Sequence, residues 1–300
     1  DLRVSLLPTV HGEKVCLRLL DKSNLATSLD DLGLNPDSLK KLRYAINQPH
    51  GLILVTGPTG SGKTTTLYSA LQEINTPDVN ITTVENPVEY QLMGINQVEI
   101  REATGMTFAK ALRSILRQDP DIVLVGETRD SETADIAVKA ALTGHLVMTT
   151  LHTNDAPSAV SRLVYMGIEP FLLASCLILS QAQRLVRRIC SNCKEQVEID
   201  AEYIKTNNLP EDLVNNTEIY KGRGCSRCGN SGYKGRTSIM EILLISKKLR
   251  DLILQSANGD ELKQAAKSEG FEDLRENGIS RVREGVTTLE EVLRVTAGDN

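Results

Sequence analysis

No apolar stretch of the sequence is long enough to cross a membrane, and no secretory signal, internal repeat or low-complexity tract is visible. The longest uncharged run, Pro170 to Gln183, has about the length of one buried helix. Neither sign of charge is in large excess: the net charge of −5 argues against a nucleic-acid binder on bulk electrostatics, although local basic patches stay possible. The 300 residues are 40% hydrophobic, which is enough for a folded core with smaller modules beside it.

Cysteine is also scarce, but four of the six cysteines are grouped. Cys16 and Cys176 stand alone, and each is expected to be a small core residue. The others form two C-x-x-C pairs separated by residues 194–224, and they are Cys190, Cys193, Cys225 and Cys228. Paired C-x-x-C knuckles in a chain without export signals are typical of tetrahedral Zn²⁺. The alternative is two redox-active or disulfide pairs, which a reducing cytosol opposes.

The size of this cysteine segment also favours zinc. A segment of about 45 residues rarely stabilises itself by burial, whereas a structural zinc can contribute about 10–16 kcal/mol. Residues 189–236 are therefore predicted to form a tetracysteine zinc module.

Glycine is concentrated in the segment GLILVTGPTGSGKTTTLY, residues 51–68, although glycine weakens strands and helices alike. The segment fits G-x-x-x-x-G-K-[ST], the phosphate-binding loop, in which N–H groups and the positive end of the next helix hold phosphate oxygens. An ordinary strand–loop–helix turn would explain the glycines but not the Lys-Thr pair. We expect Lys63 to reach the β- and γ-phosphates of ATP and the Thr64 hydroxyl to bind Mg²⁺. The loop residues predicted to bind nucleotide are Gly57, Thr59, Gly60, Ser61, Gly62, Lys63, Thr64 and Thr65.

Apolar runs alternate with helix-like segments in the middle of the chain. TFAKALRSILRQ carries its apolar residues on one helical face, and SETADIAVKAALTG is likewise helical and stops at Gly144. The strand candidates around them are Leu52–Thr56, Ile81–Val84, Ile122–Gly126 and His145–Thr150. This alternation predicts an α/β fold with a mostly parallel sheet covered by helices.

The two ends of the chain differ from the middle. Leu2 to Leu20 predicts two short strands joined by a Pro-Thr-Val-His-Gly loop, and because an isolated hairpin is marginal in water, we expect a domain that continues upstream of Asp1. The C-terminal part predicts helices, one of them with Thr288 and Glu291 as a capping box. The expected division is 1–20 for the strands, 21–35 for a polar linker, 36–188 for the core, 189–236 for the zinc module and 237–300 for a C-terminal helical region.

Carboxylates and histidines follow several of the predicted strands. Glu127 comes after DIVLVG in the Walker-B arrangement, where a carboxylate can order Mg²⁺-bound water or activate the attacking water. ITTVENPVEY carries Glu85 and Glu89, of which Glu89 is a further candidate for nucleotide binding, and TGHLVMTTLHTN carries His145 and His152. A single histidine beside a strand is usually structural. The ends of successive parallel strands, however, converge at the edge where ligands bind.

This order of motifs resembles the secretion ATPases of the type II secretion and type IV pilus systems, which drive assembly of a pseudopilus or a pilus. The resemblance covers nearly the whole sequence and rests on GPTGSGKTTT, TVENPVEY, LRQDPDIVLVGETRD and GHLVMTTLHTN, followed by the paired knuckles. It implies an ATP-hydrolysing, homohexameric, AAA-like motor with a RecA-like core, preceded by the remnant of a PAS-like α+β domain. It also implies a place on the cytoplasmic face of a bacterial inner membrane, peripheral to it, beside an inner-membrane platform protein and a cytoplasmic adaptor, and without nucleic acid.

The resemblance also implies roles for single residues. Glu127 is the catalytic Walker-B glutamate, Glu85 helps to organise Mg²⁺ and water, and His152 senses the γ-phosphate. Arg3 and Arg18 match two arginines at the end of the preceding domain that reach ATP at the interface.

Two positions depart from the family pattern. Asn86 stands where the acidic box usually has aspartate, so a carboxylate role is unavailable there. Thr128 replaces the usual aliphatic residue after Glu127, which is expected to alter the packing of that strand. The paired knuckles favour an assembly or secretion motor over the retraction motors of the family, which lack them. Pilus assembly and secretion both stay open, with the pilus slightly preferred.

Two other classes of function share some of these motifs. A nucleic-acid translocase or helicase-like ATPase would share the RecA-like core, whereas a non-catalytic nucleotide-binding scaffold would be expected to have lost Lys63 or Glu127. The basic residues around the knuckles could contact nucleic acid or anionic lipid, or balance the formal −2 charge of zinc with four thiolates. They are Arg187, Arg188, Lys194, Lys221, Arg223, Arg227, Lys234 and Arg236.

Overall fold

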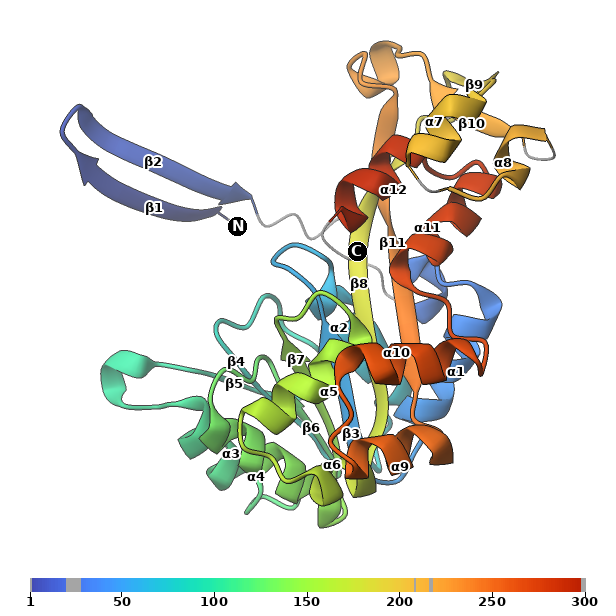
Figure 1. Ribbon diagram of the computed structural model, residues 1–300. Helices are drawn as coiled ribbons and strands as arrows, with labels where there is room; N and C mark the ends of the chain where they lie inside the picture. Colours follow the sequence, from blue (N-terminus) through green and yellow to red (C-terminus); the bar gives the residue numbers. More distant parts are fainter. Residues whose placement is uncertain (1, 20–27, 208, 216–217, 298–300) are drawn as a thin grey trace.

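The computed structural model describes residues 2–19, 28–207, 209–215 and 218–297, and most of these residues surround one seven-stranded sheet (Figure 1). The strands lie in the order β11–β8–β3–β7–β6–β4–β5. All neighbouring strands are parallel except β8 and β11, which are antiparallel. The predicted α/β fold with a mostly parallel sheet is therefore confirmed.

All four predicted strands are present in this sheet. Leu52 and Leu54 of β3 belong to one hydrophobic core and Ile53 and Val55 to another, because alternate residues of a strand point to opposite faces. Every residue of β3 is buried, as expected for a parallel strand covered on both sides. The strands are β3 (Gly51–Thr56), β4 (Ile81–Glu85), β5 (Asn96–Glu99), β6 (Ile122–Val125), β7 (Leu146–Leu151), β8 (Leu177–Ile189) and β11 (Tyr233–Leu244).

Helices supply the other half of each core. One face of the sheet is covered by α1 (Pro36–Ile46) and α2 (Lys63–Ile74), together with the short turn η1 (Leu29–Leu32). The other face is covered by α3 (Phe108–Ile115), α4 (Ser131–Leu142), α5 (Ala156–Tyr165), α6 (Pro170–Cys176), α9 (Lys247–Leu254) and α10 (Gly259–Lys267). The two predicted helical segments are confirmed as α3 and α4. No helix in the described part of the chain has the length and apolar character needed to cross a bilayer.

A third, smaller core joins the cysteine segment to the C-terminal helices. Its members come from the small sheet of β9 (Lys194–Val197) and β10 (Ile219–Gly222), from α7 (Ala201–Thr206) and α8 (Asp212–Asn215), and from α11 (Leu274–Arg283) and α12 (Leu289–Thr296). The cysteine segment therefore shares buried apolar surface with α11 and α12.

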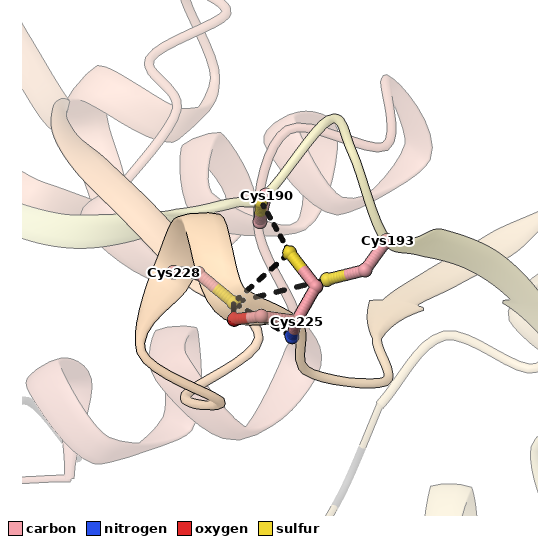
Figure 2. Close-up of side chains that lie close together, drawn as sticks. All are labelled: Cys190, Cys193, Cys225 and Cys228. Atoms are coloured by element: carbon pink, nitrogen blue, oxygen red, sulfur yellow. Dashed lines mark hydrogen bonds between the residues drawn. The ribbon is translucent and has the colours of Figure 1, made fainter.

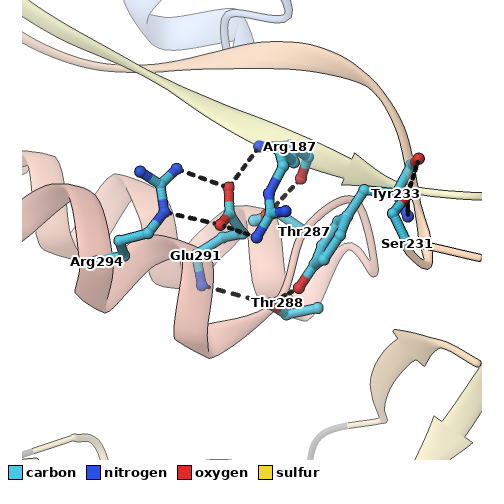
Figure 3. Close-up of polar contacts among 7 residues, drawn as sticks. All are labelled: Arg187, Ser231, Tyr233, Thr287, Thr288, Glu291 and Arg294. Atoms are coloured by element: carbon cyan, nitrogen blue, oxygen red, sulfur yellow. Dashed lines mark hydrogen bonds and ion pairs between the residues drawn. The ribbon is translucent and has the colours of Figure 1, made fainter. Parts of the chain in front are cut away.

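Glu291 attaches α12 to the end of β8. Its carboxylate accepts hydrogen bonds from the backbone N–H and the guanidinium of Arg187, at 2.9 and 2.7 Å, and from the guanidinium of Arg294 (Figure 3). The Arg187 guanidinium also lies 4.1 Å from the centre of the Tyr233 ring. Only half of the predicted capping box is present: the Thr288 hydroxyl accepts the N–H of Glu291, but the Glu291 carboxylate is bound to Arg187 and Arg294 and not to the Thr288 N–H.

The N-terminal segment is a hairpin, as predicted, with longer strands. β1 (Leu2–Thr9) and β2 (Gly12–Leu19) pair only with each other and extend outward in Figure 1. Pro8 and Thr9, expected in the loop, pair with Glu13 and Gly12, so the turn is shorter than predicted. Residues 20–27 of the predicted linker lie outside the described residues.

One expectation about the second half of the chain was wrong, and the long uncharged run divides between two elements. Of the residues from Pro170 to Gln183, those up to Cys176 form α6, and Leu177 begins β8. The region after residue 236 is not only helical, because β11 continues to Leu244 and pairs with β8 in the main sheet. Short apolar runs fit a buried strand as well as a buried helix, so periodicity alone did not separate them.

Candidate nucleotide site and tetracysteine cluster

The phosphate loop lies between the end of β3 and the start of α2. Gly57, Gly60 and Gly62 have φ angles of 142°, 79° and 94°, a backbone conformation that residues with a Cβ rarely adopt. Gly62 is the N-cap of α2 and offers no side chain to cap the first turn. The first N–H groups of a helix are donors without intrahelical partners, so this end of α2 suits an anion.

Lys63 is folded back on the loop that precedes it. Its Nζ donates to the carbonyl oxygens of Gly57 and Pro58, at 2.7 and 3.1 Å. Burial lowers the pKa of Lys63, an effect that the negative charge of Glu127 opposes and the positive charge of Arg184 reinforces. Glu127 and Arg184 are thus both within electrostatic reach of Lys63 beside the loop.

The structure also brings Glu127 and His152 together. Glu127 follows β6 and His152 follows β7, and Oε2 of Glu127 lies 3.8 Å from Nε2 of His152. The same oxygen lies 2.7 Å from Nε of Arg129, whose side chain is 69% exposed. Thr128 is buried, and its hydroxyl is hydrogen-bonded to the Thr149 hydroxyl of β7 at 2.7 Å. A polar residue is accommodated at position 128 because β7 supplies this partner.

Glu85 lies at the end of β4 and is 4% exposed. Its carboxylate accepts hydrogen bonds from the Tyr68 hydroxyl of α2, from the Thr83 hydroxyl at 2.6 Å and from the Gln97 amide at 3.3 Å. Burial and this carboxylate raise the pKa of Tyr68. Glu85 therefore connects α2 to the sheet, and its contact with Mg²⁺ stays a prediction.

For the remaining candidates of the nucleotide site, the structure gives the exposure or the strand pairing. Thr59 and Gly60 are exposed on the loop, whereas Ser61 is 3% exposed, and Thr64, Thr65 and Glu89 are half-buried. Arg3 and Arg18 are opposite each other in the pairing of β1 with β2. Their contact with ATP stays a prediction.

The four cysteines of the two knuckles converge at one point, where the ends of β8 and β11 meet (Figure 2). Their sulfur atoms all lie within 4.8 Å of one another, and the distances Cys190–Cys225, Cys193–Cys228 and Cys225–Cys228 are 3.9, 3.9 and 3.7 Å. Tetrahedral zinc with Zn–S bonds of about 2.3 Å separates its sulfur ligands by about 3.8 Å, whereas a disulfide needs about 2.05 Å. The spacing fits one tetrahedral metal ion and not two disulfides.

A neighbouring amide and several basic side chains surround this cluster of cysteines. The Asn192 amide donates to Sγ of Cys225 at 3.3 Å, and this bond, together with hydrogen bonds from Cys228 and Arg227, lowers the pKa of that thiol to about 6. Of the basic residues around the knuckles, Arg187 is paired with Glu291, and Lys194 lies 4.1 Å from the centre of the Tyr220 ring. The other six basic residues are exposed. The Lys194 ammonium of β9 therefore lies over the ring of a residue on the neighbouring strand, β10.

Sequence reasoning missed two buried polar residues of β8 beside the phosphate loop. Gln183 is 1% exposed and Arg184 is 6% exposed. The Gln183 amide donates to the carbonyl of Ser61, and Arg184 donates to the carbonyl of Asn154 at 2.8 Å, two residues after His152. The signal was the polar interruption SQAQR in an apolar segment, which has meaning only once β8 is known to be a strand beside β3.

A mostly parallel sheet with a glycine loop between the inner strand β3 and helix α2, and with a glutamate after β6, the second strand along from β3, defines the phosphate-loop class of nucleotide-binding proteins. Within this class, the chain belongs to the Type II/IV secretion system protein family, whose sequence pattern matches residues 1–294. The resemblance noted from the motifs is therefore confirmed.

Relatives of both kinds of machine are similar to this chain. It is 52% identical over 300 residues to the Type IV pilus assembly ATPase PilB of Myxococcus xanthus, which covers 100% of this chain and 53% of that relative. It is 50% identical over 298 residues to the Type II secretion system ATPase E of Vibrio cholerae, with 99% and 58% covered. The chain thus spans little more than half the length of these two curated relatives.

A solved structure of the pilus retraction motor PilT with bound ADP has a similar fold. Its TM-score is 0.71 at 30% identity, over 98% of this chain and 73% of that one. The X-ray structure of the Legionella pneumophila ATPase DotB, at 22% identity and a TM-score of 0.68, supports the fold alone.

Proposed function

We propose that this chain is the ATP-hydrolysing part of a hexameric motor that powers assembly of type IV pili or of the type II secretion pseudopilus. The observation that carries the proposal is the arrangement of Lys63, Glu127 and His152 around a phosphate loop with an uncapped helix N-terminus. The names of the relatives support the same activity.

ATP and Mg²⁺ fit the residues of this site. Lys63 exchanges its two carbonyl partners for β- and γ-phosphate oxygens, and the Thr64 hydroxyl holds Mg²⁺, which neutralises charge on the phosphates when it is bound. Glu127 orients the attacking water and accepts its proton, while His152 senses the γ-phosphate beside it. Arg129 must first leave Glu127, which costs little because its side chain is mostly exposed.

We propose that Zn²⁺ occupies the tetracysteine cluster. Cys190, Cys193, Cys225 and Cys228 supply four thiolates at tetrahedral spacing. The ion has a structural role, because all four positions are taken by protein sulfur and no open position is left for a substrate.

The RecA-like core, the AAA-like homohexamer and the PAS-like origin of β1 and β2 are parts of the same proposal. So are its partners, an inner-membrane platform protein and a cytoplasmic adaptor, and a place on the cytoplasmic face of a bacterial inner membrane. The similarity to a pilus ATPase and to a type II secretion ATPase, at 52% and 50% identity, favours neither machine.

The test is ATP hydrolysis measured across fractions of different oligomer size, with and without nucleic acid. We expect activity to follow the hexamer fraction and to be unchanged by DNA or RNA. Several-fold stimulation by either nucleic acid would instead support a translocase, and absence of hydrolysis in every fraction would contradict the proposal.

A further inference from the structure

Gln183 lies underneath the phosphate loop and uses both ends of its amide group. Its Nε2 donates to the Ser61 carbonyl of the loop at 2.8 Å. Its Oε1 accepts from the Thr66 hydroxyl in the first turn of α2 at 3.0 Å, and from Nε2 of Gln181 at 2.9 Å. One buried side chain of β8 therefore holds the loop and the helix that follows it.

The loop glycines are also fitted to Gln183. A Cβ on Gly57 would lie 2.6 Å from the Gln183 carbonyl oxygen, and a Cβ on Gly62 would lie 3.1 Å from Gln183 Nε2. Side chains at these positions would push the loop away from β8. The glycines thus allow a close approach to the strand as well as an unusual backbone conformation.

The strand that carries Gln183 continues to the tetracysteine cluster. β8 ends at Ile189, directly before Cys190, and Ile189 is paired with Tyr233 of β11. Arg187, between Gln183 and Cys190, is bound to Glu291 of α12. The loop is therefore attached to the strand pair whose far end holds the four cysteines.

We propose that Gln183 is a positioning residue for the phosphate loop: it fixes Ser61 and Thr66 relative to β8, so that the loop N–H groups are arranged before nucleotide arrives. The part of the proposal that concerns nucleotide affinity rests on the proposed ATP-binding function. A preorganised loop loses less conformational freedom on binding, so loosening it weakens binding without removing any group that touches the phosphates.

The test is Gln183→Met, which keeps the size of the side chain and removes all three hydrogen bonds. The matched control is Gln181→Met, on the same strand and also fully buried. It removes the bond from Gln181 to Gln183 but keeps the bonds that join Gln183 to Ser61 and Thr66, and no described hydrogen bond joins the Gln181 side chain itself to the loop. Thr66→Val removes the helix-side bond alone and serves as the second variant if Gln183→Met fails to fold.

The first readout is amide hydrogen exchange of residues 57–66 without nucleotide. We expect at least fivefold faster exchange in Gln183→Met, a smaller increase in Thr66→Val and no change in Gln181→Met. Equal exchange in Gln183→Met, Thr66→Val and the wild type, or an equal increase in the control, would overturn the proposal.

The second readout is ATP binding with kcat measured separately. We expect Kd and KM for ATP to rise about tenfold in Gln183→Met, equivalent to about 1.4 kcal/mol, with a much smaller change in kcat. If the wild type binds no ATP, the proposed function fails, and the exchange experiment still decides the role of Gln183. A fall in kcat at unchanged KM would contradict positioning of the loop for binding.

Discussion

At the scale of single residues, each of two charged groups of the nucleotide site has a partner within the chain. Lys63 is bound to loop carbonyls and Glu127 to the exposed Arg129, so neither charge is left without a partner. An exposed ion pair of this kind contributes about 0–1 kcal/mol. Glu127 can therefore leave Arg129 at little cost when nucleotide binds.

Glu241 of β11 gives a prediction at the same scale. It is 2% exposed, and its carboxylate accepts the first N–H groups of α5 and α11, from Ala156 at 2.6 Å and Leu274 at 2.9 Å. Burial raises its pKa from 4.5 to about 8, against the effect of the Ala156 N–H. The folded state therefore holds a proton that the unfolded state releases near pH 4.5.

The resulting contribution to stability is complete below pH about 4.5 and is lost as the pH rises through about 8. We expect the free energy of unfolding of the wild type to fall across this range more steeply than that of Glu241→Gln, whose side chain does not titrate. Denaturant unfolding at several pH values measures both slopes. Parallel curves for the two proteins would contradict the assignment.

At the scale of elements, the sequence was sufficient for the strands that are continuous apolar runs. β3, β4, β6 and β7 were predicted, and with them the positions of Lys63, Glu127 and His152, because the ends of parallel strands meet at one edge. β8 and β11 were not predicted. Buried polar residues such as Gln183 and Glu241 interrupt their apolar pattern, and the contacts that satisfy these residues come from distant parts of the chain.

The attachment of α12 to β8 is testable by Glu291→Gln. Burial raises the pKa of Glu291, but hydrogen bonds from Arg294 and Arg187 lower it by more than burial raises it. The resulting pKa is about 2. We expect the substitution to lower the free energy of unfolding by about 2 kcal/mol at pH 7, since it weakens charge-assisted bonds to two partly exposed arginines. The contribution of Glu291 is present above pH about 4.5 and is lost as the pH falls through about 2.

Glu290→Gln is the matched control, because Glu290 is exposed on the same helix. A control that destabilises the protein as much as Glu291→Gln would show that the effect belongs to the charge of the helix and not to the contact with β8.

At the scale of the whole molecule, the tetracysteine cluster closes the far end of the strand pair β8–β11. We expect metal analysis to find one Zn²⁺ per chain. Cys225→Ser should loosen residues 190–236 while the phosphate loop still binds nucleotide, because the main sheet has its own two cores. Cys16→Ser is the control, since Cys16 is exposed in the hairpin, contrary to the expected core position, and lies outside the cluster. Zinc-free protein whose four knuckle thiols are alkylated in the native state would contradict the site.

The hairpin gives the second prediction at this scale. If Arg18 reaches ATP as a neighbour's arginine finger, Arg18→Ala should assemble and bind ATP but lose most hydrolysis, because such a finger is worth about 10³–10⁵ in turnover. Arg3→Ala is expected to behave similarly. Mixing Arg18→Ala with Glu127→Gln chains should then restore activity, since one kind of site becomes complete in trans. No recovery would place the arginine at the ATP of its own chain, and full activity of both single variants would contradict either form.

The central claim is that the residues around the phosphate loop bind ATP and hydrolyse it. The most direct measurement compares ATP binding and steady-state ATP hydrolysis in the wild type, Lys63→Ala and Glu127→Gln. The account predicts that Lys63→Ala loses tight binding, because the cation facing the β- and γ-phosphates is gone, and that Glu127→Gln binds ATP as the wild type does but hydrolyses it at least a hundredfold more slowly. Wild-type affinity in Lys63→Ala, or near-normal turnover in Glu127→Gln, would contradict it.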